Sequence, residues 1–264
     1  MKAIAAAMRL ARQIDARLDI IWFKDWGLGC RFDELFEPLP AFPAGGCLRE
    51  ATWTDALFLD HPRRRNFWIP QYFERLRFGR RIDEAETTRL MNAGTDFYAL
   101  CRGKRVWMSA CVYFLCADDH LIPDDSFDGF VPITPIQDAV QQQLQQLGSD
   151  FIGVHIRRSD NRISWEQSPT SLFIERMEAE PATTRFYVAT DSETVKKELT
   201  DHFGTRVLTA PRAAERGSLA GMRDAVAEMY LLSHARALMG SAGSTFSMTA
   251  AKLGRTPLTI IRRP

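Results

Sequence analysis

Three short polar stretches follow apolar runs in this chain, and their residue types could together bind an anion. The first is His155-Ile-Arg-Arg-Ser-Asp160, after an apolar run that begins at Phe151. Arg157 and Arg158 carry planar guanidinium groups whose donors match phosphate oxygens. The alternative is a surface ion pair between these arginines and Asp160 or another nearby acid. The choice between an anion site and an ion pair depends on which residues the rest of the chain brings beside this stretch.

The second and third stretches supply an acid and a row of hydroxyls. Thr190-Asp-Ser192 follows an apolar run, and Asp191 or Ser192 could serve there simply as the cap of the next helix. Gly240-Ser-Ala-Gly-Ser-Thr-Phe-Ser247 is richer in small and hydroxyl residues than a helix cap requires. At a helix N-terminus such residues form a cradle of N–H and O–H donors for an anion.

The elements around these stretches predict that they meet. From residue 148 the sequence alternates between expected strands at 151–156, 185–189, 206–208, 237–239 and 258–261 and expected helices at 169–177, 192–203, 223–233 and 244–253. This alternation predicts a parallel sheet with right-handed crossovers, in which ligands bind at the carboxyl ends of the strands. All three polar stretches lie at such ends. We therefore expect one site for a phosphorylated ligand, without a P-loop and without a required metal.

The 264 residues suit two domains, which we place at 1–147 and 148–264. In the first half the pattern predicts an amphipathic helix at 4–18, a strand at 18–23, a helix at 83–100 and a strand at 105–115. A further helix at 135–147 closes it. Gly27-Leu-Gly29 reads as a turn, because it lacks the third glycine of a nucleotide loop and no long helix follows.

Composition limits the kinds of partner. The chain has 34 basic and 33 acidic residues, a net charge of +1, so nothing favours nucleic acid as a partner and an anion site must be local. Five cysteines without a C-x-x-C pair indicate neither a disulfide framework nor a zinc site, which favours the reducing cytosol. No apolar run reaches membrane-spanning length. We expect a cytoplasmic protein without an integral membrane segment, either free or peripheral to the inner face of the membrane.

Taken in order, the motifs resemble those of a known enzyme family. His155–Asp160, Tyr187–Ser192, and Glu228–Ser233 running into Gly240–Ser247 are similar to the three C-terminal motifs of GDP-fucose fucosyltransferases. The similarity is greatest to the α1,6-fucosyltransferase and nodulation-type group, with features of the protein O-fucosyltransferases. It implies a GT-B architecture: two Rossmann-like domains that face each other across a cleft. The C-terminal domain would bind GDP-fucose, with no metal and no cofactor.

The resemblance also implies roles for residues. Fucose would pass from GDP-fucose, with inversion, to a hydroxyl of a glycan or lipid-linked oligosaccharide. Arg157 would hold the β-phosphate with help from His155, and Arg158 would support the loop or a phosphate. Glu228 would bond the guanine edge, and Glu166 is the candidate catalytic base. Matched positions that would line the donor or lie near it are Asp160, Asp191, Ser192, Ser244, Thr245, Phe246 and Ser247.

One departure from the family concerns the start of the chain. Members begin their first domain with a strand and a glycine-rich loop, followed by a helix similar to Ala3–Ala11, and here the sequence begins at that helix. We therefore expect an N-terminal domain that lacks its first strand. Either the true start codon lies upstream, or the chain is an inactive or truncated nucleotide-sugar-binding pseudoenzyme. A third alternative is a transferase that uses another GDP-sugar.

Overall fold

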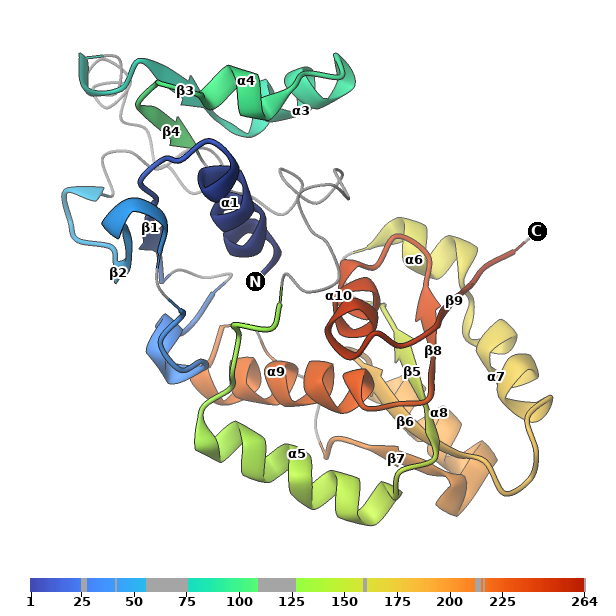
Figure 1. The fold of residues 1–264 in the computed structure, drawn as a ribbon. Helices are drawn as coiled ribbons and strands as arrows, with labels where there is room; N and C mark the ends of the chain where they lie inside the picture. Colours follow the sequence, from blue (N-terminus) through green and yellow to red (C-terminus); the bar gives the residue numbers. More distant parts are fainter. Residues whose placement is uncertain are drawn as a thin grey trace. The chain divides into compact units, whose positions relative to one another are not determined.

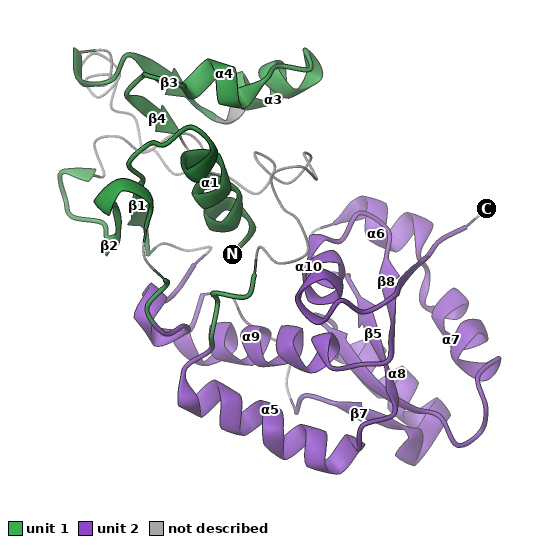
Figure 2. Ribbon diagram, in the orientation of Figure 1, with its two compact units in different colours: residues 1–24, 38–131 green, residues 25–37, 132–264 purple. Residues whose placement is uncertain are grey.

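The computed structural model describes residues 1–24, 28–40, 42–55, 76–108, 127–158, 161–211, 215 and 217–263. The chain forms two compact units (Figure 2). Unit 1 comprises Met1–Lys24 and Pro38–Val131, and unit 2 comprises Asp25–Glu37 and Pro132–Pro264. Each unit is therefore discontinuous in sequence.

Unit 2 contains a five-stranded parallel sheet with the strand order β7-β6-β5-β8-β9 (Figure 1). Numbered within this unit, the order is the 3-2-1-4-5 arrangement of doubly wound nucleotide-binding folds. The parallel sheet predicted from the sequence is thus confirmed, and the strand order reverses between β5 and β8. The strands are β5 (Phe151–Ile156), β6 (Arg185–Thr190), β7 (Val207–Thr209), β8 (Ala237–Ser241) and β9 (Leu258–Ile261).

Helices cover both faces of this sheet, because alternate residues of each strand point to opposite faces. On one face Ile152 and Val154 of β5 pack with residues of α7 and α8. On the other face Phe151 packs with residues of α5, α9 and α10. Every residue of β5 is buried, as its apolar run predicts. The helices are α5 (Thr134–Leu147), α6 (Arg162–Gln167), α7 (Thr170–Glu178), α8 (Glu193–Phe203), α9 (Leu219–Ser233) and α10 (Thr245–Gly254).

The division between the units differs from the boundary expected at residue 148. Val140 and Leu147 of α5 lie in the same core as Tyr187 and Leu231, so α5 belongs to unit 2. The amphipathic pattern of α5 shows that one face is buried but not against which partner. The glycine after it, Gly148, has φ +79 and ends the helix rather than marking a linker.

A segment from early in the chain also belongs to unit 2. Residues 28–37 contain a short 3₁₀ helix, η1 (Phe32–Glu34). Phe36 forms an antiparallel bridge with Pro132, and the Ile133 N–H donates to the Leu35 carbonyl at 3.0 Å. Arg223 of α9 donates through Nε to the Glu34 carbonyl at 3.1 Å. Gly29, expected in a simple turn, lies so close to the segment just before α9 that a Cβ there would be 2.4 Å from the Gly217 carbonyl oxygen.

Unit 1 contains two small parallel pairs of strands, β1–β2 and β3–β4. The predicted helix at 83–100 is two helices, since Gly94 takes φ +64 and Asp96 starts a new helix by accepting from the N–H groups of Tyr98 and Ala99. The continuation of the predicted strand at 105–115 beyond residue 108 lies outside the described residues, as does Gly27. The elements are α1 (Lys2–Gln13), β1 (Asp19–Trp22), η2 (Pro43–Gly45), β2 (Cys47–Glu50), β3 (Arg80–Ile82), α3 (Glu84–Asn92), α4 (Phe97–Cys101) and β4 (Val106–Met108).

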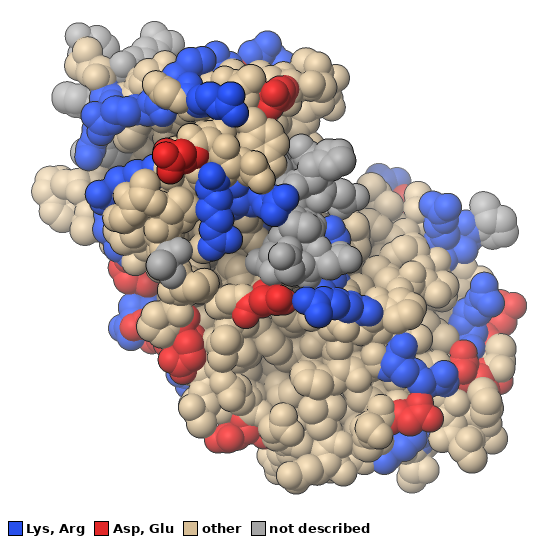
Figure 3. All heavy atoms as spheres, in the orientation of Figure 1, with Lys and Arg blue, Asp and Glu red and all other residues tan. Residues whose placement is uncertain are grey.

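Charge is unevenly spread over the face seen in Figure 3. Lys and Arg side chains gather over unit 1, whereas the charged side chains visible on unit 2 are of both signs and surround an uncharged area. Among the described residues, no helix is both long enough and apolar enough to cross a bilayer.

Candidate functional site

The carboxyl ends of β5 and β8 lie side by side where the strand order reverses, the position at which open α/β sheets bind ligands. Ser241, the last residue of β8, links them. Its hydroxyl accepts from the Arg157 N–H at 3.1 Å and lies 3.4 Å from the His155 carbonyl, to which it donates. The backbone that follows β5 is thereby fixed against β8.

Arg157 is held by the acid that follows the neighbouring strand. Its Nη1 lies 3.0 Å from Oδ2 of Asp191, and the two side chains are only 17% and 16% exposed. The other oxygen, Oδ1, accepts from the Arg158 N–H at 2.7 Å. The ion-pair alternative is therefore correct in part, but the partner is Asp191 and the pair is largely buried. Asp191 does not cap α8; it orients a guanidinium group at the edge of the sheet.

Arg158 has a different position. Its Nη1 donates to the Arg157 carbonyl at 2.8 Å, and its Nη2 donates to the Ser168 carbonyl and the Thr170 hydroxyl, each at 3.0 Å. The resemblance implies that Arg158 supports either the loop or a phosphate. These contacts tie Arg158 to the chain that leads into α7, so they correspond to support of the loop.

His155 is buried beneath this edge. Its Nδ1 lies 3.3 Å from the Ser244 hydroxyl, and its ring stacks on Phe246 with centroids 4.7 Å apart. Burial and, after it, the charge of Arg157 together lower the pKa of His155 to about 4, against the opposing effect of Asp191. The imidazole is therefore neutral near pH 7 and interacts as a hydrogen-bonding group rather than as a cation.

The hydroxyl residues at the start of α10 have two different roles. Some lie at the candidate site, and one packs in the interior of the fold. Ser244 is the N-cap residue, yet its hydroxyl makes no cap bond and lies instead beside His155. Thr245 is exposed. Ser247 is buried, donates to the Ser244 carbonyl at 3.3 Å and packs on Gly240, where a Cβ would lie 2.6 Å from its oxygen. Ser247 thus serves packing, and Ser244 and Thr245 lie at the helix N-terminus.

A helix that the sequence does not predict makes hydrogen bonds to the loop between β8 and α10. Residues 162–167, within the expected site loop, form α6. Asn161 donates to the Gly243 carbonyl at 3.1 Å, and the Ser164 hydroxyl donates to the Ala242 carbonyl at 2.6 Å. The Ser168 hydroxyl accepts from the Ala242 N–H at 2.9 Å. The signal was present in Asn161, a preferred N-cap residue that accepts from the Ser164 N–H.

Glu228 is a buried acid without a full set of partners. It lies on α9, and its Oε1 has no hydrogen-bond partner in the described part of the chain. Burial raises the pKa of Glu228 to about 8, against the opposing charge of Lys196. The buried Tyr187 hydroxyl likewise has no partner among those residues, and its pKa is raised by burial and then by Glu228. A ligand that carries donors could satisfy the carboxylate.

Two predicted site residues are not brought into this arrangement, and the position of a third is not described. Glu166 has a side chain that is 47% exposed and pairs with Arg162, one helical turn away, at 2.6 Å. Ser192 accepts from the Val195 N–H at 3.4 Å and caps α8, as its alternative interpretation held. Asp160 lies outside the described residues.

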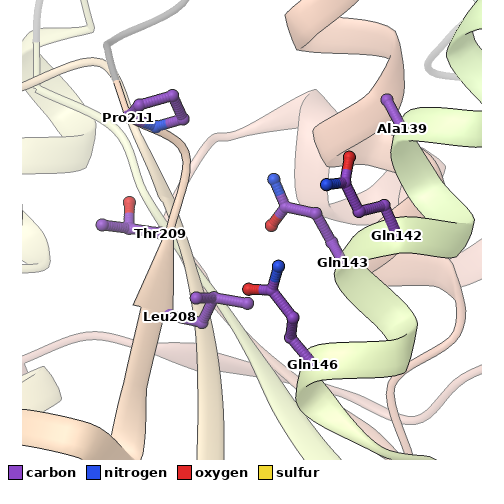
Figure 4. Close-up of a pocket in the computed structure, with 7 residues that line it drawn as sticks. All are labelled: Ala139, Gln142, Gln143, Gln146, Leu208, Thr209 and Pro211. Carbon is purple, nitrogen blue, oxygen red and sulfur yellow. The ribbon is translucent and has the colours of Figure 1, made fainter.

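A pocket of about 260 Å³ lies beside β7, the edge strand, and α5 (Figure 4). None of the predicted site residues lines it. Within the described chain, the buried Gln143 Oε1 and Thr209 Oγ1 have no hydrogen-bond partner. The lining residues are Ala139, Gln142, Gln143, Gln146, Leu208, Thr209 and Pro211.

Comparison with known proteins defines the class of fold. No family model matches the sequence, and no curated protein does. Solved structures do match, and they confirm the expected α/β fold of the GT-B type seen in GDP-fucose fucosyltransferases.

Two of these structures illustrate the similarity. The NodZ α-1,6-fucosyltransferase soaked with GDP-fucose is 20% identical, with a TM-score of 0.61 over 95% of this chain and 86% of that one. A further NodZ structure is from Bradyrhizobium. POFUT1 in complex with GDP-fucose is 10% identical, with a TM-score of 0.57 over 98% of this chain and 93% of that one. At these identities the similarity establishes the fold.

Proposed function

We propose that this chain is a glycosyltransferase that moves fucose from GDP-fucose to a hydroxyl of a glycan acceptor, with inversion and without a metal. The observation that carries the proposal is the Arg157–Asp191 pair at the strand ends beside the β5–β8 reversal, with Ser241 and Ser244 next to it. The proposal is supported by the fold shared with NodZ soaked with GDP-fucose and with POFUT1 in complex with GDP-fucose.

In the proposed reaction, an acceptor hydroxyl forms a bond to fucose C1 while the bond from C1 to the GDP oxygen breaks. Negative charge grows on the departing diphosphate, and preorganised donors stabilise it. Arg157 supplies a positive charge that Asp191 holds in place, and Ser244 and the N-terminus of α10 supply neutral donors. The acceptor proton passes to a base, for which Glu166 is the candidate.

Glu228 is assigned to the base of the nucleotide. Guanine presents two adjacent donors, N1–H and N2–H, and an ionised carboxylate can accept both. The unpartnered Oε1 of Glu228 is consistent with this role.

Calorimetric titration with GDP, UDP and GDP-fucose tests the donor assignment. We expect GDP to bind more tightly than UDP. Arg157→Ala should lose about 1.5–3 kcal/mol of GDP binding, roughly 10- to 150-fold in affinity. The matched control is Arg236→Ala, since Arg236 pairs with Asp150 just before β8, at the amino end of that strand. Equal GDP affinity in Arg157→Ala and the parent would refute the role of Arg157.

Transfer itself needs a separate assay. Incubation of GDP-fucose with a panel of oligosaccharides should release GDP and yield a fucosylated product, in the presence of EDTA as well as without it. NMR of the new linkage should show inversion at C1. Activity abolished by EDTA and restored by a divalent cation would overturn the metal-free mechanism.

A second candidate is a nucleotide-sugar-binding protein that does not catalyse transfer. It is favoured by the position of Glu166, which is half exposed and paired with Arg162. Tight GDP-fucose binding with neither hydrolysis nor transfer would establish this alternative. A fall in kcat in Glu166→Gln, with KM unchanged, would exclude it.

A further inference from the structure

The pocket beside β7 and α5 has no part in the function proposed above. Its volume is about 260 Å³, below the roughly 300–1,000 Å³ of pockets that hold drug-sized ligands. β7 is the edge strand of the five-stranded sheet, so the pocket lies at one border of the sheet, away from the reversal between β5 and β8. A space of this size suits one small unit, such as a single ring.

Carboxamides line one wall of this pocket, and aliphatic groups line the other. Gln142, Gln143 and Gln146 extend from α5 toward the strand side of the pocket (Figure 4). Leu208 and Pro211 lie opposite them. Among the described residues that line the pocket, none is charged and none is aromatic. The lining can therefore exchange hydrogen bonds with a neutral ligand and pack against its carbon atoms.

Gln143 is an unexpected residue for its position on α5. It lies three residues after Val140 and four before Leu147, which are both buried in the core of unit 2, so it falls on the core-facing side of the helix. Its Oε1 is buried and has no hydrogen-bond partner in the part of the chain that the structure describes. A buried acceptor without a donor lowers stability, and it is explained most directly by a ligand group that donates to it.

Hydrogen bonds fix both walls of the pocket. Arg185, the first residue of β6, donates through Nη1 to the Gln146 carbonyl, near the C-terminal end of α5. On the other side, Lys196 Nζ donates to the Ala210 carbonyl at 3.0 Å, and Ala210 directly precedes Pro211. The carboxamides thus face a wall that is already in place, which reduces the entropy lost when a ligand binds.

We propose that this pocket binds one neutral saccharide unit, at a second site separate from the proposed donor site. Gln143 Oε1 accepts from a sugar hydroxyl, and the carboxamides of Gln142 and Gln146 bond to neighbouring hydroxyls. A hydroxyl both donates and accepts, as a carboxamide does, so adjacent hydroxyls on a ring match adjacent carboxamides on a helix. The C–H groups of the ring pack against Leu208. In this described lining a phosphate meets no cation and an ammonium group meets no carboxylate, which disfavours charged ligands.

Saturation-transfer NMR with the full chain tests the proposal. The probes are the methyl glycosides of glucose, galactose, mannose and N-acetylglucosamine, with guanosine for comparison. At least one glycoside should receive saturation at its ring protons, with a Kd on the order of 1 mM for so small a ligand, and saturating GDP should not displace it. Transfer to no glycoside, transfer to guanosine alone, or displacement of the glycoside by GDP would each overturn the inference.

Two variants change the pocket from different positions on α5. Gln143→Leu removes the acceptor, and Ala139→Phe fills the space from an exposed position of the lining. Each should weaken glycoside binding by about tenfold or more and leave GDP affinity unchanged. The matched control is Gln145→Leu, at an exposed position of the same helix outside the lining, which should change neither affinity. Parent-like glycoside binding in either pocket variant, once folded, would refute the site.

The stability of Gln143→Leu provides a second readout. Because this change removes a buried oxygen that has no partner in the described chain, the urea midpoint of unfolding should rise, whereas Gln145→Leu should leave it unchanged. An unchanged or lower midpoint in Gln143→Leu would show that the fold itself satisfies the carboxamide, and would overturn the inference. A parent that binds a glycoside at this pocket but not GDP would refute the proposed function and leave the saccharide site standing.

Discussion

At the scale of single residues, two buried ionisable side chains are neutral near pH 7 in the absence of a ligand. Burial lowers the pKa of His155 to about 4 and raises the pKa of Glu228 to about 8. One of these groups must change its charge for the proposed chemistry, because only an ionised Glu228 accepts two hydrogen bonds from guanine. GDP binding and protonation are therefore coupled at Glu228.

We predict that GDP affinity rises with pH up to about 8. Below that pH Glu228 is mainly protonated in the free protein, so binding must release a proton, at a cost of up to about tenfold in affinity for each pH unit. Titrations at several pH values, in buffers of different ionisation enthalpy, measure both effects. Glu228→Gln is the control. It removes the contribution of Glu228 to the pH dependence of GDP affinity and keeps the contribution that comes from titration of the GDP phosphate. A parallel pH dependence in the two proteins would contradict the coupling.

We predict that His155 makes the fold less stable in acid. The unfolded chain protonates this imidazole near pH 6.5 and the folded chain only near pH 4, so the unfolded state binds more protons between these values. The free energy of unfolding should fall as the pH drops through this window, by up to about 3 kcal/mol, and should not change for this reason above it. Urea unfolding of the parent and of His155→Gln at pH 7.5 and pH 5 measures the difference. Equal losses in both proteins would show that His155 is not responsible.

At the scale of elements, the register between β5 and β6 explains the central contact. Ile156 pairs with Thr190, so the next residues on each strand, Arg157 and Asp191, emerge side by side. The sequence predicts that both lie at strand ends, because buried strands have a recognisable length and composition. Their pairing could not be predicted, since register depends on packing between distant segments.

The helices show the same limit: a local sequence pattern predicts a helix, but not the distant segment against which it packs. α9 and α10 were predicted because their buried faces repeat with a helical period. α6 was missed because it is short and exposes Ile163 and Trp165, which blurs that period. The sequence predicts α5 as a helix of the first domain, whereas its buried residues pack in the core of unit 2. Periodicity reveals a buried face and not its partner.

We predict that α6 maintains the loop before α10. Ser164→Ala should destabilise the protein by about 1–3 kcal/mol, because it leaves the Ala242 carbonyl buried without that donor. GDP affinity should fall as well, since the loop carries Ser244. Chemical denaturation and calorimetry measure the two effects, with Ser171→Ala on the exposed face of α7 as the matched control. Wild-type stability in Ser164→Ala would show that α6 does not brace the loop.

At the scale of the whole molecule, the chain passes between the units three times, near residues 24, 37 and 131. Unit 2 is therefore assembled from segments that lie on both sides of a long insertion. A boundary placed at residue 148 would separate both α5 and the segment that contains η1 from the rest of unit 2.

We predict that a fragment 132–264 folds cooperatively and that 148–264 does not. The shorter fragment lacks Val140 and Leu147, and it exposes the apolar surface of Tyr187 and Leu231 that α5 buries. Circular dichroism and urea unfolding of the two fragments provide the comparison. Equally cooperative unfolding of the two fragments would show that the sheet does not require α5, and would support the boundary at residue 148 that the sequence predicts.

The bridge between Phe36 and Pro132 has a consequence for how such a protein can diversify. Because these residues are paired neighbours, the segment 38–131 leaves unit 2 and re-enters it at adjacent points. Insertions with adjacent ends are the kind that domains tolerate best. Because Met1–Lys24 also belongs to unit 1 and β1 pairs with β2, an exchange of unit 1 would replace both of its segments, with junctions near residues 24, 37 and 131 and without rethreading the five-stranded sheet. Chimaeras built on this pattern could exchange unit 1 while retaining the proposed donor site.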